Sequence, residues 1–211
     1  MLQFLLKLVR FPDFSQNSYR VPHLTSLDTP GKNKLEWGAI FDGGWLRAHE
    51  KEVQMKKILG ALVFVLVCEL AGVIGSLATA PSVPGWYARL AKPSFNPPNS
   101  VFGPVWTILY ALMGISAYLV YQKGWKRSDV RKALAVFAVQ LVLNALWSIV
   151  FFGAHMILGG VVVIILLWAM ILASIWLFSK ISRAAAYLLI PYILWVSFAT
   201  ILNISLYVLN R

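Results

Sequence analysis

Three segments of the chain carry aromatic and amide side chains at the spacing of one helix face. An interior lined by such residues has large flat apolar walls and a few neutral hydrogen-bonding groups, as in a site for a flat, mostly apolar ligand. Packing alone gives the same pattern, because aromatic side chains often only fill space or mark a membrane interface. The spacing leaves both interpretations open. The three sets are Trp106, Tyr110, Ala117 and Tyr121; Gln140, Asn144, Trp147 and Phe151; and Tyr192, Trp195, Ala199 and Asn203.

Several other chemistries lack the residues they need. A haem held by two histidines requires His within helices, and after residue 50 the chain has only His155, in a polar break. The single cysteine, Cys68, excludes a disulfide framework, a Cys-based zinc site and an iron–sulfur cluster within one chain. Residues 55–211 contain no Ser/His/Asp set, Gly-rich phosphate loop or metal-binding cluster. We therefore expect no metal and no required cofactor.

Glu69 is the one acidic residue within the apolar stretches of the chain. An ion channel or proton pump would place several ionisable groups there. A carboxyl group in hydrocarbon is costly, so Glu69 should face the interior of the protein. A functional role and a structural hydrogen bond to a neighbouring helix are equally compatible with that position.

The elements that position these residues follow from the composition. Of 211 residues, 59% are apolar and only 13% are charged, with a mean hydropathy of +0.72; soluble domains carry about 25% charged residues. The net charge is +11, and residues 55–211 hold 12 Lys and Arg against two acids. This combination excludes a disordered chain, a coiled coil and a nucleic-acid partner, and it is typical of an integral membrane protein with basic loops.

Five apolar stretches, each of about 20 residues or more, follow one another after Met55, and each is long enough to cross a bilayer as a helix. Their residues are apolar at nearly every position, unlike the alternating strands of a membrane β-barrel. We predict an all-α integral membrane protein, a bundle of five transmembrane helices in which Gln140, Asn144 and Asn203 point inward. A tight turn near 153–155 separates two of the stretches. The stretches are 57–79, 102–122, 132–152, 156–179 and 184–209.

The break at residues 80–101 contains five prolines and cannot form one continuous helix. Its aromatic residues Trp86, Tyr87 and Phe95 favour an ordered loop over one end of the bundle, with a plain linker as the alternative. Nine basic residues gather in the breaks on one side of the membrane and three on the other. This bias predicts that the first helix begins inside and that the 80–101 loop lies outside.

Residues 1–54 differ in composition, with mixed charge and no apolar span. We predict two parts: an N-terminal extension, 1–54, that is partly disordered, and a membrane domain, 55–211. The extension carries too many acids for a transit peptide.

The sequence resembles the TspO/translocator protein family, also known as tryptophan-rich sensory proteins and peripheral benzodiazepine receptors. The resemblance covers residues 56–211 and is most specific in WY, KPSFNPP and FGPVWTILYALMG, between Trp86 and Gly114. It continues in QLVLNALWSIVFFG and LLIPYILWVSFATILNISLYVLN. The resemblance implies a five-helix bundle, usually a homodimer, with a pocket closed by the first loop.

The resemblance also implies what the pocket binds and which residues line it. Family members bind tetrapyrroles such as protoporphyrin IX, synthetic isoquinoline and benzodiazepine-type ligands, and in some cases sterols. The pocket overlaps the residues found from spacing, so it now outweighs packing alone as an explanation. Carried over residue by residue, it uses Tyr87, Trp106, Tyr110, Asn144, Trp147, Trp195 and Ala199.

Three functions from different classes follow. The first is a membrane-embedded binding and sensory protein, or receptor, in which the aromatic walls stack a macrocycle and Arg89 and Lys92 pair with its propionates. The second is a light-dependent porphyrin-degrading enzyme, in which Trp106 and Trp195 would take part by family resemblance. The third is transport of porphyrin or lipid, which five helices without an inverted repeat match poorly.

The expected setting is a multi-pass protein among membrane lipids, in a bacterial cytoplasmic membrane in preference to a mitochondrial outer membrane. The homodimer implied by the resemblance would use the outer face of the third helix. We expect Ala133, Ala138 and Ala145 on that face, where small side chains permit close approach.

Overall fold

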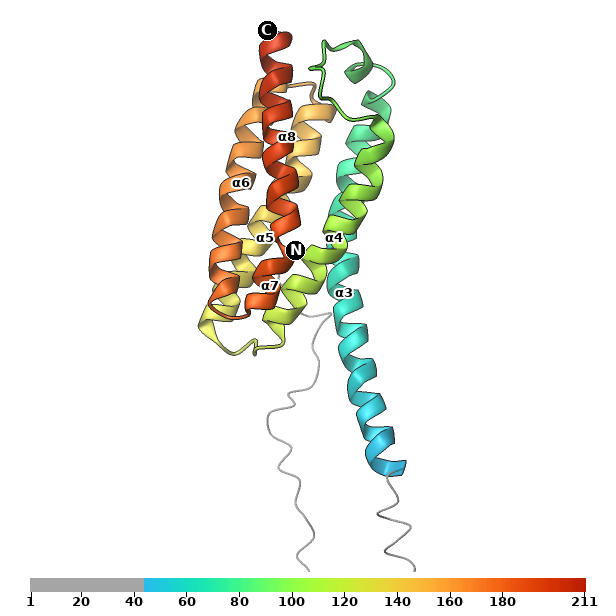
Figure 1. The fold of residues 1–211 in the computed structure, drawn as a ribbon, viewed down its shortest axis with the longest axis vertical. Helices are drawn as coiled ribbons and strands as arrows, with labels where there is room; N and C mark the ends of the chain where they lie inside the picture. Colours follow the sequence, from blue (N-terminus) through green and yellow to red (C-terminus); the bar gives the residue numbers. More distant parts are fainter. Residues whose placement is uncertain (1–43) are drawn as a thin grey trace, which may run out of the picture. The chain divides into compact units, whose positions relative to one another are not determined.

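In the described part of the chain, five helices are long and apolar enough to cross a membrane. The computed structural model describes residues 44–211, and residues 56–211 form a compact unit. The helices of this unit run alongside one another, with α8 ending beside the loop that joins α3 to α4 (Figure 1). The described part contains no strand. The elements are α3 (Gly44–Ser82), the 3₁₀ turn η2 (Tyr87–Arg89), α4 (Asn99–Tyr121), α5 (Ser128–Ser148), the π-helical turn η3 (Ile149–Gly153), α6 (Ile157–Ser179), α7 (Arg183–Leu188) and α8 (Ile190–Leu209).

The prediction of five membrane-spanning helices is confirmed, and the first helix begins earlier than the sequence suggested. Helix α3 starts at Gly44, and its candidate membrane span runs from Arg47 to Ser82 rather than from residue 57. Residues 44–54 of the predicted extension are therefore helical. The rest of that extension, 1–43, lies outside the described residues.

The expected turn between the third and fourth helices is confirmed at residues 153–156. Helix α5 passes into η3, where Ala154 N donates to Ile149 O at 2.8 Å, one residue further back than in an α-helix. His155 then adopts a positive φ of 56°, which reverses the chain direction. The uncharged run thus forms two spans joined by a short turn.

The last apolar stretch, predicted as one helix over 184–209, forms one candidate membrane span from Arg183 to Leu209, interrupted at Leu189. Helix α7 ends at Leu188 and α8 begins at Ile190. Pro191 has no N–H, so the carbonyl of Tyr187 lacks its usual partner four residues on. Leu189 N instead donates to Ala186 O at 3.1 Å, which is the tighter bond of a 3₁₀ turn.

The core lies where α4, α5, α6 and α8 face one another, and Met113, Ile171, Phe178, Tyr192 and Val196 are fully enclosed there. Helix α3 meets α4 at Gly114. A Cβ at Gly114 would overlap the backbone of Val65, so only glycine allows the two helices to approach this closely.

The expectation of an outward face made by Ala133, Ala138 and Ala145 is wrong for Ala133. Ala133 is fully buried within the chain, and the other two are half-buried. The reason is helical spacing: Ala133 lies four and seven residues before Phe137 and Gln140, both of which are buried. The exposed large apolar side chains of α5 are Val139, Val142 and Leu146, and Ile149 follows them at the start of η3.

Candidate ligand-binding site

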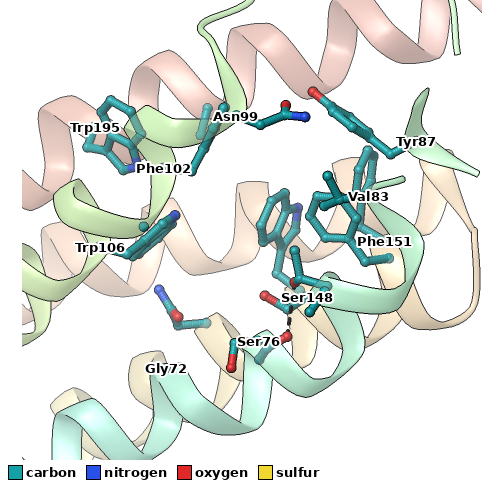
Figure 2. Close-up of a pocket in the computed structure, with 18 of the residues that line it drawn as sticks. Gly72, Ser76, Val83, Tyr87, Asn99, Phe102, Trp106, Ser148, Phe151 and Trp195 are labelled. Carbon is teal, nitrogen blue, oxygen red and sulfur yellow. Dashed lines mark hydrogen bonds between the residues drawn. The ribbon is translucent and has the colours of Figure 1, made fainter. Parts of the chain in front are cut away.

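A cavity of about 420 Å³ lies between α3, α4, α5 and α8, near the loop that joins α3 to α4 (Figure 2). Its volume lies within the range of small-molecule sites, about 300–1,000 Å³. The loop, residues 83–98, contributes Val83 and Tyr87 to the lining. All seven residues predicted for the site line this one cavity: Tyr87, Trp106, Tyr110, Asn144, Trp147, Trp195 and Ala199.

Aromatic rings form most of the walls. Trp106 stacks on Tyr110 with ring centres 5.5 Å apart and an interplanar angle of 29°. Trp147 stacks on Phe151 at 5.4 Å and 12°. The wall from α8 is made by Trp195, whose ring meets the edge of Phe102 at 5.9 Å. These pairs present flat apolar faces from three helices, as the helical spacing predicted.

Asn144 belongs to a buried chain of hydrogen bonds that joins three helices. Tyr110 OH donates to Asn144 Oδ1 at 2.5 Å, and Asn144 Nδ2 donates to Tyr192 OH at 2.9 Å. Tyr192 OH in turn donates to Gln140 Oε1 at 2.9 Å. Both ends of the Asn144 amide therefore already have a protein partner. The inward orientation expected of Gln140 and Asn144 is confirmed.

A second amide, Asn203 on α8, is oriented by Trp147. The indole Nε1 of Trp147 donates to Asn203 Oδ1 at 3.0 Å. An indole N–H can only donate, so the amide oxygen must face Trp147 and the amide nitrogen must face away. That nitrogen, Asn203 Nδ2, is buried and has no partner among the described residues, and the same is true of Trp195 Nε1.

Tyr87 of the loop lines the cavity, and only 4% of this residue is exposed. Its hydroxyl donates to Asn96 Oδ1 at 2.9 Å, a bond within the loop. Burial raises the pKa of Tyr87, and the bond to Asn96 opposes that rise. Tyr87 thus remains neutral at physiological pH.

Arg89 and Lys92, the basic residues of the loop, bind loop backbone. Lys92 Nζ donates to Ala88 O and Leu90 O at 3.1 and 3.2 Å and lies 4.9 Å above the Tyr87 ring centre. Arg89 Nε donates to Gly85 O at 3.3 Å. Neither side chain lines the cavity.

Helix α3 closes the cavity with small side chains and one acid. A Cβ at Gly72 would overlap the Tyr110 ring, so glycine makes room there for an aromatic wall residue. Glu69, which was expected to face the interior, is half-buried and lines the cavity, and in the described part of the chain it is the one lining residue with a carboxyl or basic group. No three His, Cys, Asp or Glu side chains cluster within residues 44–211.

Some lining residues were absent from the predicted site. Phe102 lies four residues before Trp106, so helical spacing alone could have placed it on the same wall. Phe151 was in the aromatic–amide set of its helix but not among the residues carried over from the family. Asn203 was in the aromatic–amide set of its helix but not among the residues carried over from the family. Val83 had no sequence signal, because its position depends on how the loop folds back.

Together, the fold and the cavity define a class: a multi-pass membrane protein whose described residues form five helices able to span a membrane and a cavity walled by aromatic rings. Comparison with known proteins gives the family. The family model for the TspO/MBR family matches residues 64–209, and the chain belongs to this family.

Relatives from bacteria, archaea and mammals support this assignment. The chain is 42% identical to the "Tryptophan-rich protein TspO" of Chlorobaculum tepidum over 155 residues, 74% of this chain and 98% of the relative. It is 44% identical to the protein of that name from Archaeoglobus fulgidus, over 72% of this chain and 98% of the relative. The "Translocator protein" of Bos taurus is 33% identical, over 72% and 90% of the two chains.

Proposed function

We propose that this chain binds tetrapyrroles of the protoporphyrin IX type, and related flat apolar molecules, as a membrane-embedded sensory protein. The observation that carries the proposal is the cavity: stacked rings on α4 and α5 and the Trp195 ring on α8 surround one space. A flat macrocycle gains most from such walls, because offset stacking and burial of apolar area act over its whole face.

The polar groups of the cavity suit a neutral ring system with a few acceptors. Two buried donors, Asn203 Nδ2 and Trp195 Nε1, have no partner among the described residues. A ligand acceptor that reached either donor would satisfy a buried group that is otherwise costly. For the propionates of a porphyrin, Lys92 above Tyr87 offers a cation at the loop, provided that its bonds to loop carbonyls are exchanged.

Titration in lipid nanodiscs tests the proposal. Protoporphyrin IX should quench tryptophan fluorescence saturably, and Trp106→Phe and Trp195→Phe should each weaken binding several-fold. Trp176→Phe is the matched control, because Trp176 is on α6 and 59% exposed, away from the cavity lining. Quenching that does not saturate in the wild type would refute the proposed function.

A second candidate function is light-dependent degradation of the bound porphyrin. The observation that favours it is that Trp106 and Trp195, the two residues named for it by family resemblance, both line the cavity. Illuminated samples with oxygen should then yield a new absorbing product, more slowly in Trp106→Phe. Bleaching at the rate of free porphyrin in both proteins would leave binding as the function.

A further inference from the structure

The side chain of Asn210, immediately after α8, pairs with both backbone polar groups of Ala91 in the loop. Ala91 N donates to Asn210 Oδ1 at 2.9 Å, and Asn210 Nδ2 donates to Ala91 O at 2.9 Å. The two residues are 119 positions apart in the sequence. This two-bond contact, which we call the loop latch, joins the loop to the end of the last helix.

The chemistry of the loop latch fixes the orientation of the amide. Only the amide oxygen can accept from Ala91 N, and only the amide nitrogen can donate to Ala91 O. Asn210 Nδ2 also donates to Leu206 O at 2.8 Å, within its own helix. The amide is therefore held on α8 and presented to the loop, whichever way the loop moves.

On the other side of Tyr87 the loop is held by packing. Trp86 stacks on His155 with ring centres 4.6 Å apart and an interplanar angle of 15°. It also meets Phe151 edge-on at 5.4 Å. Ser82 Oγ donates to Phe152 O at 2.7 Å, which ties the end of α3 to η3. The side that carries the loop latch has two hydrogen bonds at an exposed position and the edge contact of Phe95 with Phe198.

We propose that Asn210 is a positioning residue that controls ligand exchange by holding the loop, and Tyr87 with it, over the cavity. The loop opens when the two bonds to Ala91 break and the edge contact of Phe95 with Phe198 on α8, with ring centres 6.3 Å apart, separates. It then swings about the Trp86–His155 side. A hydrogen bond at an exposed site contributes little net free energy, because water can replace either partner. We therefore expect the two bonds between Asn210 and Ala91 to break and re-form frequently. Loops of this kind commonly limit how fast ligands enter and leave.

This inference rests on the proposed function for its ligand but on the loop latch for its mechanism. Neither Ala91 nor Asn210 lines the cavity, so breaking their contact leaves the walls intact. That separation distinguishes a residue that controls exchange from a residue that binds the ligand.

The first experiment needs no ligand. Hydrogen exchange of the loop amides is compared in the full chain in nanodiscs for wild type, Asn210→Ala and Asn210→Asp. The aspartate variant is nearly isosteric but places an oxygen against the carbonyls of Ala91 and Leu206. Both variants should exchange about tenfold faster across residues 89–96. Ser205→Ala, which removes the bond from Ser205 Oγ to Ile201 O on the same helix, should leave the loop unchanged. Unchanged loop exchange in both Asn210 variants would overturn the proposal.

The second experiment measures protoporphyrin IX binding rates by stopped-flow quenching. In Asn210→Ala, association and dissociation should both accelerate several-fold, while Kd changes less than either rate. A merely structural defect would instead speed dissociation alone, and that result would also overturn the proposal. If wild-type protein shows no saturable quenching, the proposed function fails, while the hydrogen-exchange result still decides the role of Asn210.

A third experiment holds the loop closed with a cross-link, instead of weakening its contact with α8. Ala91→Cys and Asn210→Cys, made together with Cys68→Ala, are bridged by a short reagent that dithiothreitol cleaves. Closing the bridge should slow porphyrin association and dissociation at least tenfold, and cleavage should restore the rates. Exchange at the uncross-linked rate while the bridge is closed would show that the ligand does not pass the loop.

Discussion

The indole of Trp147 on α5 and the amide of Asn203 on α8 form one hydrogen bond, 3.0 Å long, at the wall of the cavity. Each group loses its described partner if the other is removed, because Asn203 Oδ1 accepts from Trp147 and the indole N–H has that one acceptor among the described residues. We therefore expect the contribution of this hydrogen bond to the free energy of unfolding to be lost when either residue is replaced.

A double-mutant cycle tests that dependence. Asn203→Leu leaves the Trp147 N–H without its acceptor, and Trp147→Phe leaves the Asn203 amide oxygen without its donor. Each change should therefore lower the free energy of unfolding by about 1–3 kcal/mol. The double variant should cost clearly less than the sum of the single changes. Unfolding in detergent, followed by circular dichroism, measures all four proteins. Strict additivity would show that the bond contributes nothing.

We expect Asn144 to contribute to both the stability of the protein and porphyrin binding, and Trp106 to contribute mainly to porphyrin binding. Asn144→Leu leaves the Tyr110 hydroxyl without its acceptor, so it should lower the unfolding free energy by about 1–3 kcal/mol as well as weaken porphyrin binding. Trp106→Phe keeps a ring and should weaken binding several-fold with a smaller change in stability. Thermal unfolding and fluorescence titration of both variants separate the effects. Equal losses of stability would argue against this division of roles.

The crossing of α3 and α4 depends on Gly114. Gly114→Ala places a Cβ against the backbone of Val65, which cannot move as a side chain can, so we expect a loss of about 1–3 kcal/mol or more. Gly103→Ala on the same helix is the control, because nothing lies within 4 Å of the added Cβ. Thermal midpoints of the two variants should differ by several degrees, with Gly103→Ala at or above the wild type.

The basic residues predict how the protein sits in its membrane. Lys123, Lys126, Arg127 and Lys180 lie in the turns at the end opposite the loop, which implies that the loop is outside. In a Cys68→Ala background, Ser94→Cys in the loop should react with an impermeant maleimide on intact cells. Ser128→Cys, also at an exposed position, at the start of α5, should react only after the cells are opened. The reverse pattern would invert the orientation.

A homodimer should form through the exposed face of α5 rather than through its alanines. Val139, Val142 and Leu146 on α5, with Ile149 at the start of η3, make an exposed apolar strip. In the Cys68→Ala background, Val142→Cys should form an intermolecular disulfide in lipid bilayers, whereas Leu166→Cys on exposed α6 should not. Cross-linking of Leu166→Cys alone would place the contact on α6.

Much of the bundle was determined by the sequence alone. Apolar runs of about 20 residues specify spanning helices whatever their neighbours are, because backbone groups in hydrocarbon must bond within the helix. Spacing within one helix then decides which residues share a face, and for this reason Gln140, Asn144 and Asn203 were correctly expected to be buried. The same rule, applied to Ala133, would have placed it inward beside Phe137.

The tertiary structure decided which of these groups meet. Asn144 and Asn203 have the same chemistry and similar burial, yet one bonds two tyrosines and the other a tryptophan. Their partners lie on other helices, and the choice depends on how each helix is rotated and where it crosses the next. The pairing of Asn210 with Ala91 is the clearest example, because nothing in the sequence around either residue indicates that the two meet. Their contact exists only because the bundle brings the end of α8 to the loop, 119 residues away along the chain.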